Sequence, residues 1–209
     1  MIELALSAFV TLFVVLDPPG MAPIFAGLTA NETDASRRRL ALRATVTAGV
    51  ILIAFAFVGE WVLRMLGVTI EAFRIAGGLL LFMVAVDMLF AHETPLRRTT
   101  AVEEEEAIQR QDISVFPLAI PLIAGPGAMT TVVLLMQQAA GEPLRQAMTI
   151  GILALVLVLV LIGLLAAVRL VRVIGVTGTN VITRVLGLIL GALAVQYVID
   201  GVLTILGTD

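Results

Sequence analysis

The sequence predicts an all-α, polytopic membrane protein whose six transmembrane segments form two inverted three-helix repeats, with segments 1 and 4 broken. Hydrophobic residues make up 60% of the 209 residues and charged residues only 14%, and the mean hydropathy is +1.09. These values lie far outside the range of soluble domains of this size. The chain also contains six long apolar stretches and a pattern of prolines and glycines that recurs in its two halves.

Each apolar stretch is long enough to cross a membrane, because about 20 apolar residues span a hydrocarbon core of about 30 Å. The six stretches are approximately 3–28, 43–64, 70–90, 113–138, 147–168 and 181–206. No basic region precedes the first stretch and no A-x-A pattern ends it, so we expect a retained segment rather than a removed signal peptide. Residues 1–209 are therefore predicted to form a single transmembrane domain.

Segments 1 and 4 are predicted to be broken helices or helical hairpins. Segment 1 contains Asp-Pro-Pro-Gly at 17–20 with Pro23 shortly after, and segment 4 contains Gly-Pro-Gly at 125–127 after Pro117 and Pro121. Proline removes a backbone donor and clashes with the preceding turn, while glycine adopts conformations that other residues avoid. Backbone groups freed at this depth must face protein or water rather than lipid.

Three markers keep their order in the two halves. They are Pro19-Gly20 with Pro126-Gly127 at an offset of 107, Gly67-Val68-Thr69 with Gly175-Val176-Thr177 at 108, and Arg74 with Arg184 at 110. Because each half crosses the membrane an odd number of times, the second half enters from the opposite side, as in an inverted repeat. We expect a first repeat at 1–95, an acidic cytoplasmic loop at 96–112 and a second, inverted repeat at 113–209. Chance similarity between apolar runs is the alternative.

The arginines predict the orientation of the bundle. Ten of the thirteen basic residues fall on one side of the six predicted segments, and only Arg64, Arg74 and Arg145 fall on the other. Basic residues are enriched in cytoplasmic loops, so the arginine-rich side is predicted to be cytoplasmic and both termini to lie outside. The run of glutamates at 103–106 is most simply part of a solvated loop.

Asp17 follows the apolar run at 13–16 and lies deep in segment 1, which at about 1.5 Å per residue places it well inside the bilayer. A carboxylate at that depth is a functional hypothesis by default. The structural alternative is that Asp17 and Pro18 are the N-cap and first residue of a new half-helix. The two roles are compatible, because a cap at the wall of a cavity also faces whatever enters it.

Two half-helix N-termini are predicted, one near Gly20 and Met21 and its inverted counterpart near Gly127 and Ala128. Such ends carry unpaired N–H donors and the positive end of the backbone dipole, so they attract anionic groups. If both meet at the midplane, they could bind a carboxylate while carbonyls or Asp17 bind an ammonium group. Bending for better packing is the alternative. The predicted substrate-binding residues are Asp17, Pro18, Gly20, Met21, Pro23, Gly125, Pro126, Gly127, Ala128, Thr130 and Thr131.

Asp87, near the end of segment 3, is the second candidate beside Asp17 for coupling to a proton or sodium ion. A position at an interface or cavity mouth is the alternative. Arg74 flanks the short second loop, where we expect an interfacial anchor or ion pair, with gating as the alternative. The chain has no cysteine and its single histidine, His92, falls in a polar loop, so no metal site, cofactor or catalytic residue is predicted.

The segments at 16–25 (LDPPGMAPIF) and 117–127 (PLAIPLIAGPG) resemble the signature motifs of the MarC family of bacterial inner-membrane proteins. The resemblance covers essentially the whole chain, including the six segments and the acidic central loop. It implies a place in the lysine-exporter-like superfamily of small transporters, a location in the bacterial inner membrane, and transport of neutral amino acids such as glycine and alanine, which is assigned to some members. The family's motif residues correspond to Asp17, Pro18, Gly20, Pro23, Gly125, Pro126 and Gly127.

We therefore predict a secondary transporter or exporter of small neutral amino acids, with its site between the two broken helices and a proton or sodium gradient as its drive. An ion or small-metabolite permease of the same fold is the alternative, with Asp17 and freed carbonyls as ion ligands. The sequence contains no P-loop, HExxH or GxSxG motif, so neither ATP hydrolysis nor another enzyme activity is expected. The expected partners are a zwitterionic substrate, the coupling ion and lipid, without nucleic acid. A homo-oligomer is compatible with so small a bundle.

Overall fold

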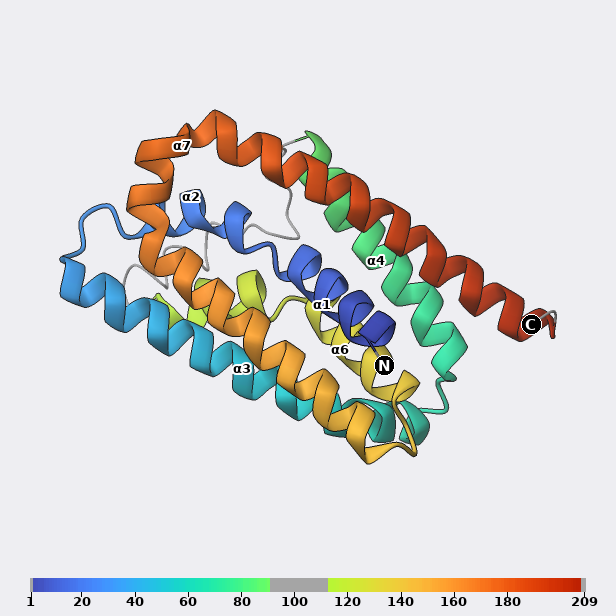
Figure 1. Cartoon of the computed structure of the whole chain (residues 1–209). Helices are drawn as coiled ribbons and strands as arrows, with labels where there is room; N and C mark the ends of the chain where they lie inside the picture. The colour runs from blue at the N-terminus through green and yellow to red at the C-terminus, as the bar shows by residue number, and fades with distance from the viewer. Residues whose placement is uncertain (1, 91–112, 208–209) are drawn as a thin grey trace.

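A computed structural model describes residues 2–90 and 113–207 of the chain. The described residues form helices and no strands (Figure 1). The elements are α1 (Ile2–Leu16), α2 (Pro18–Leu28), α3 (Asp34–Met65), α4 (Ile70–Phe90), η1 (Ser114–Ile123), α6 (Pro126–Gln138) and α7 (Pro143–Leu206). Within these residues, five helical segments are long and apolar enough to span a membrane, or six if the bent pair η1 and α6 is one span. The prediction of an all-α, multi-pass membrane protein is confirmed, whereas the predicted acidic loop at 96–112 lies outside the described residues.

Helix α3 begins earlier than the predicted segment at 43–64, because its first turns are polar and held by local hydrogen bonds. The Thr33 hydroxyl accepts a hydrogen bond from the Ser36 N–H at 3.3 Å and so caps the helix. The Arg37 Nε–H donates to the Thr29 carbonyl at 2.9 Å and ties the new helix to the end of α2. A hydropathy pattern detects only the apolar part of such a helix, so the predicted boundary was too late.

Helix α7 contains the fifth and sixth predicted segments, and a corner within it separates them. The helix changes direction at Gly175, which has φ 73° and ψ 165°, values that favour glycine. Residues Pro143–Gly175 and Thr177–Leu206 form two separate apolar spans on either side of it. Figure 1 shows these two parts of α7 joined by a corner at one end of the molecule.

Helix α4 packs against the second part of α7 along a line of glycines, which we call the glycine seam (Gly78, Gly187 and Gly201). A Cβ atom on Gly78 would lie 2.7 Å from the Ala194 carbonyl oxygen, and one on Gly187 would lie 2.7 Å from the Met88 Cβ. Residue numbers fall along α4 as they rise along α7, so the two helices are antiparallel. Small residues allow this close approach, which is the usual basis of helix packing in lipid.

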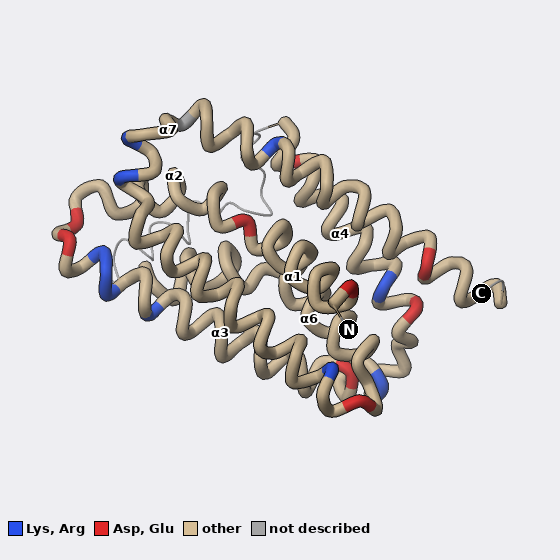
Figure 2. Tube along the Cα trace, viewed as in Figure 1, with Lys and Arg blue, Asp and Glu red and all other residues tan. Residues whose placement is uncertain are grey.

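Both chain termini lie toward the same end of the bundle as the connections at 66–69 and 139–142 (Figure 1). We call this the terminal end. Figure 2 shows basic positions gathered toward the opposite end, around the start of α3 and the corner of α7. This separation agrees with the arginine pattern on which the predicted orientation depends, while the sidedness itself stays a prediction.

Candidate functional site

The first interruption is a single residue, Asp17, between α1 and α2. Asp17 has φ 45° and ψ 60°, the left-handed conformation, and its side chain is completely buried. Its Oδ1 atom accepts a hydrogen bond from the Gly20 N–H at 3.1 Å and so caps α2, whose first residue is Pro18. The structure therefore contains the predicted cap. Left-handed conformations of residues other than glycine are uncommon and concentrate at functional sites.

Both parts of α7 approach this interruption closely. A Cβ atom on Gly163 would lie 3.2 Å from the Pro18 carbonyl oxygen, and one on Gly20 would lie 2.8 Å from the Thr183 hydroxyl oxygen. The same Gly20 Cβ would overlap the Asp17 carboxylate. The absence of side chains at these glycines thus places the carboxylate of Asp17 beside the two spans of α7, with a hydroxyl group from Thr183 nearby.

The second interruption lies between η1 and α6, whose axes differ in direction by 56°. Element η1 is a wide helical segment with extended backbone at Phe116 and Ile120, each followed by a cis peptide bond to proline. Helix α6 begins at Pro126 after Gly125, and no side chain caps it. Because proline has no N–H, the first backbone donors at this buried end belong to Gly127 and Ala128. Only the second half-helix therefore begins with uncapped donors.

The walls of the second interruption come from α4 and α3. A Cβ atom on Gly127 would lie 2.9 Å from the Leu81 Cδ2, and one on Gly77 would overlap the Thr130 side chain. On the α3 side, α3 contacts both η1 and α6, and a Cβ atom on Gly59 would overlap Val133 about two turns into α6. Each interruption thus lies against helices from the opposite half of the chain: the first against α7, the second against α3 and α4.

The two predicted threonines donate their hydroxyl hydrogens within α6. Thr130 Oγ1 donates to the Pro126 carbonyl at 2.9 Å, and Thr131 Oγ1 donates to the Gly127 carbonyl at 2.8 Å. Their oxygen atoms can still accept a hydrogen bond. A ligand at this level would therefore meet acceptors rather than donors from these side chains.

The predicted binding residues fall into two groups, one at each interruption. Most of them are buried, and only Pro23, Gly125 and Pro126 retain appreciable exposure. Helix α1 contacts α6, which brings the two interrupted segments side by side. Asp87 lies elsewhere, on α4 near the glycine seam, where its side chain is buried. Its Oδ2 atom has no hydrogen-bond partner among residues 2–90 and 113–207.

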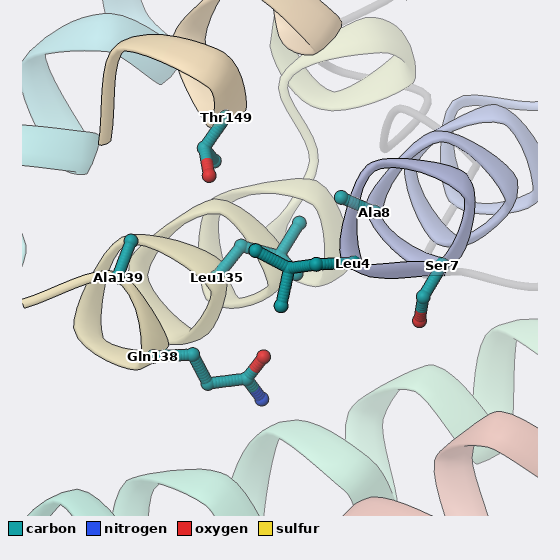
Figure 3. A pocket seen from close by; sticks show the side chains of 7 residues that line it. All are labelled: Leu4, Ser7, Ala8, Leu135, Gln138, Ala139 and Thr149. Atoms are coloured by element: carbon teal, nitrogen blue, oxygen red, sulfur yellow. The ribbon is translucent and has the colours of Figure 1, made fainter. Parts of the chain in front are cut away.

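A small pocket that the sequence did not predict opens between α1, α6 and the start of α7. Its polar side chains are Ser7, Gln138 and Thr149, and Leu4 and Leu135 are among the apolar side chains that line it (Figure 3). It lies toward the terminal end, away from the interruptions. Ser7 and Thr149 are isolated polar residues in otherwise apolar segments. Each alone is weak evidence for a pocket, and the two can be related only once the positions of the helices are known.

A second feature missed by the sequence is a polar cluster of Thr11 on α1, Arg74 on α4 and Tyr197 on α7. The Tyr197 hydroxyl lies near the Thr11 side chain, and the charges of Arg74 and Asp200 act on it. Thr11 and Tyr197 are 3% and 8% exposed. Asp200 lies one turn further along α7 and accepts a hydrogen bond from Gln196 at 2.6 Å. Residues so far apart in the sequence carry no common local pattern.

Comparison with known proteins gives one consistent result. Residues 2–206 match the family described as MarC family integral membrane protein. A UPF0056 membrane protein of Archaeoglobus fulgidus is 37% identical over 195 residues, covering 93% of this chain and 90% of the relative. UPF0056 membrane protein YvbG of Bacillus subtilis is 36% identical over 93% of this chain and 92% of its own length, and YhcE of Escherichia coli is 33% identical over 93% and 89%. No solved structure matches the chain.

Proposed function

Because this chain belongs to the MarC family of integral membrane proteins, we propose that it is a secondary transporter of small neutral amino acids such as alanine or glycine. The proposed site lies between the two interrupted segments. Both interruptions break the regular backbone hydrogen bonding of a helix inside an apolar bundle, which is unfavourable. Such breaks are therefore expected where they form a functional site. The single observation that carries the proposal is the buried Asp17 carboxylate at a left-handed junction between α1 and α2.

The two interruptions differ in a way that suits a zwitterion. Asp17 covers the N-terminus of α2 with a carboxyl group, and the ionised form of this group would favour a cation such as an ammonium group at this end. The N-terminus of α6 has no side-chain cap, so its Gly127 and Ala128 donors favour an anion such as a carboxylate. A neutral amino acid carries both groups a short distance apart. This asymmetry favours an amino acid over a simple cation.

The packing of the helices supports the proposal of two inverted repeats. Each interruption lies against the long helices of the other half, through Gly163 and Thr183 in one case and through Gly59 and Gly77 in the other. The third helices of the two proposed halves, α4 and the second part of α7, are antiparallel along the glycine seam. An axis in the membrane plane relates halves in this way in many secondary transporters.

Coupling to a proton or sodium ion is proposed for Asp17 and Asp87. A buried carboxylate in a membrane helix is costly when ionised, so its protonation or ion occupancy changes the energy of the state that buries it. Asp87 lies beside the glycine seam, where movement of α4 along α7 would alter its surroundings. We place the protein in the cytoplasmic membrane of a bacterium, with both termini on the periplasmic side.

The proposal is tested by uptake of labelled alanine and glycine into proteoliposomes under imposed proton and sodium gradients. Wild-type protein is expected to accumulate at least one of them, and Asp17→Asn is expected to lose most of that uptake. Asp34→Asn is the matched control, because the Asp34 side chain is fully exposed. Uptake equal to that of empty liposomes under every gradient would reject the amino-acid proposal. Cation flux without amino-acid flux would favour the permease instead.

A further inference from the structure

Arg74 is a charged residue in the membrane-spanning helix α4, and it forms no ion pair with the residues that the structure describes. It lies in the second turn of α4, and its Nε atom is buried with no hydrogen-bond partner in the part of the chain that the structure describes. Among the same residues, no carboxylate lies within ion-pair distance of it. Arg74 as a whole is half-buried, but a charged nitrogen held out of water without an acceptor is unfavourable, and charged residues in membrane helices usually mark a ligand pathway.

The position of Arg74 is fixed by the glycines that follow it. Gly77 lies against Thr130 of α6, and Gly78 lies against Ala194 and Val198 of α7. Arg74 is three and four residues before them and so occupies the same face of α4, one turn closer to the terminal end. Side chains on a helix lean toward its N-terminus, so Arg74 extends toward the terminal end, between α6 and α7.

The pocket at the terminal end shares faces of α1 and α6 with this cluster and with the second interruption. Leu4, Ser7 and Ala8 of α1 line the pocket, and Thr11 lies on the same face of α1 one turn deeper. Thr11 lies near Tyr197, which has Arg74 in its electrostatic surroundings. On α6, Leu135 lines the pocket, Thr131 lies one turn deeper and Gly127 one turn beyond that. Arg74 thus lies between the pocket and the N-terminus of α6.

We propose that Arg74, positioned beside Tyr197 and Thr11, binds the carboxylate group of a small solute on its way from the terminal-end pocket to the interruptions. A guanidinium group presents paired donors that match the two oxygens of a carboxylate. The Tyr197 hydroxyl adds a neutral donor and acceptor at the same level. This inference rests on the proposed function, because it assigns the carboxylate of the same substrate.

Arg184 provides a matched comparison within the same chain. It occupies the equivalent place in the proposed second repeat, but its side chain is exposed. An exposed arginine near a helix end can reach lipid phosphate groups, which is the ordinary role of such residues. The contrast between the two arginines separates a solute site at Arg74 from a general attraction of arginine to anionic lipid.

The test is calorimetric titration of the purified full-length protein in neutral detergent with propionate, which has a carboxylate but no ammonium, and with alaninol, which has the ammonium but no carboxylate. Wild-type protein is expected to bind propionate, and Arg74→Gln is expected to weaken that binding at least tenfold. Arg184→Gln should bind propionate as the wild type does, and alaninol binding should be the same in all three proteins. Arg74→Lys serves as a second variant if Arg74→Gln does not fold. It keeps the charge but not the paired donors of the guanidinium group, so a smaller loss of propionate affinity is expected.

Equal propionate affinity in wild type and Arg74→Gln, or no propionate binding to the wild type, would overturn the inference. Equal weakening of propionate and alaninol would also overturn it, because it would mean a structural role. If Arg74→Gln weakened the binding of phosphatidylglycerol but left the binding of propionate unchanged, Arg74 would be a lipid-binding residue and the solute site would be rejected. If propionate binding depends on Arg74 but the protein transports no amino acid, the carboxylate site is supported and only the proposed substrate is rejected.

Discussion

The carboxylate of Asp17 accepts a hydrogen bond from the backbone N–H of Gly20 at 3.1 Å, and both residues are buried in the middle of an apolar bundle. This contact satisfies one of the donors at the start of α2. It also keeps the carboxyl group of Asp17 beside both spans of α7. One side chain can therefore hold the local fold and contribute to a binding site, and substitutions can separate these two contributions.

Asp17→Asn should preserve the cap and remove the charge. Asparagine is as good an N-cap as aspartate and also tolerates the left-handed conformation, so thermal unfolding in detergent should change little. Asp17→Ala removes the cap and should cost about 1 kcal/mol. Similar destabilisation by both substitutions would mean that the charge, rather than the cap, stabilises the junction.

Gly20→Ala should destabilise the protein, because the new Cβ would overlap the Asp17 carboxylate and approach the Thr183 hydroxyl. Gly27→Ala, in the same helix, is the matched control, since nothing lies within 4 Å of its Cβ position. That substitution should be neutral or stabilising by up to about 1 kcal/mol, as expected for alanine in a helix. Unfolding curves in detergent that respond in the same way to both alanines would contradict the packing at Gly20.

Gly78→Ala should weaken the glycine seam. Its Cβ would lie 2.7 Å from the Ala194 carbonyl oxygen, which is backbone and cannot rotate away, so α4 and α7 would have to separate. We expect a loss of about 1–3 kcal/mol in the free energy of unfolding, the usual range for overpacking. Gly151→Ala, at an open position of α7, should lose none, and chemical denaturation of the two variants compares them directly.

Tyr197→Phe and Thr11→Val should each destabilise the protein by about 1 kcal/mol, because each removes one polar group of a buried pair and leaves the other without its polar neighbour. The double variant should be less destabilised than the sum of the two. A double-mutant cycle measured by thermal unfolding in detergent should give a coupling of about 0.5–1.5 kcal/mol. A coupling near zero would remove the proposed link between α1 and α7.

The orientation can be tested by single-cysteine labelling, because the natural chain has no cysteine. Leu66→Cys places a thiol at the terminal end, where the native side chain is 72% exposed, and should react with a membrane-impermeant maleimide added to intact cells. Glu32→Cys, near the arginine-rich end, should react only after permeabilisation. The reverse pattern would invert the topology.

The sequence determined the environment of this protein and the places where its segments are interrupted. Composition alone excluded a soluble fold, and the prolines and glycines at 17–20 and 125–127 located both interruptions, because these residues limit the backbone wherever they occur. Helix ends were less predictable. Hydropathy could not detect the polar first turns of α3, nor that the fifth and sixth segments stay helical up to a corner at Gly175.

Tertiary structure decided which side chains meet. Thr11, Arg74 and Tyr197 come from three helices, and only the rotation and register of those helices bring them together. The neighbours of Asp17 on α7 depend on glycines at contact points whose partners no local pattern identifies. The physical reason is that hydropathy and helix-breaking tendencies are properties of adjacent residues, whereas a site in a helical bundle is built from the contacts between helices.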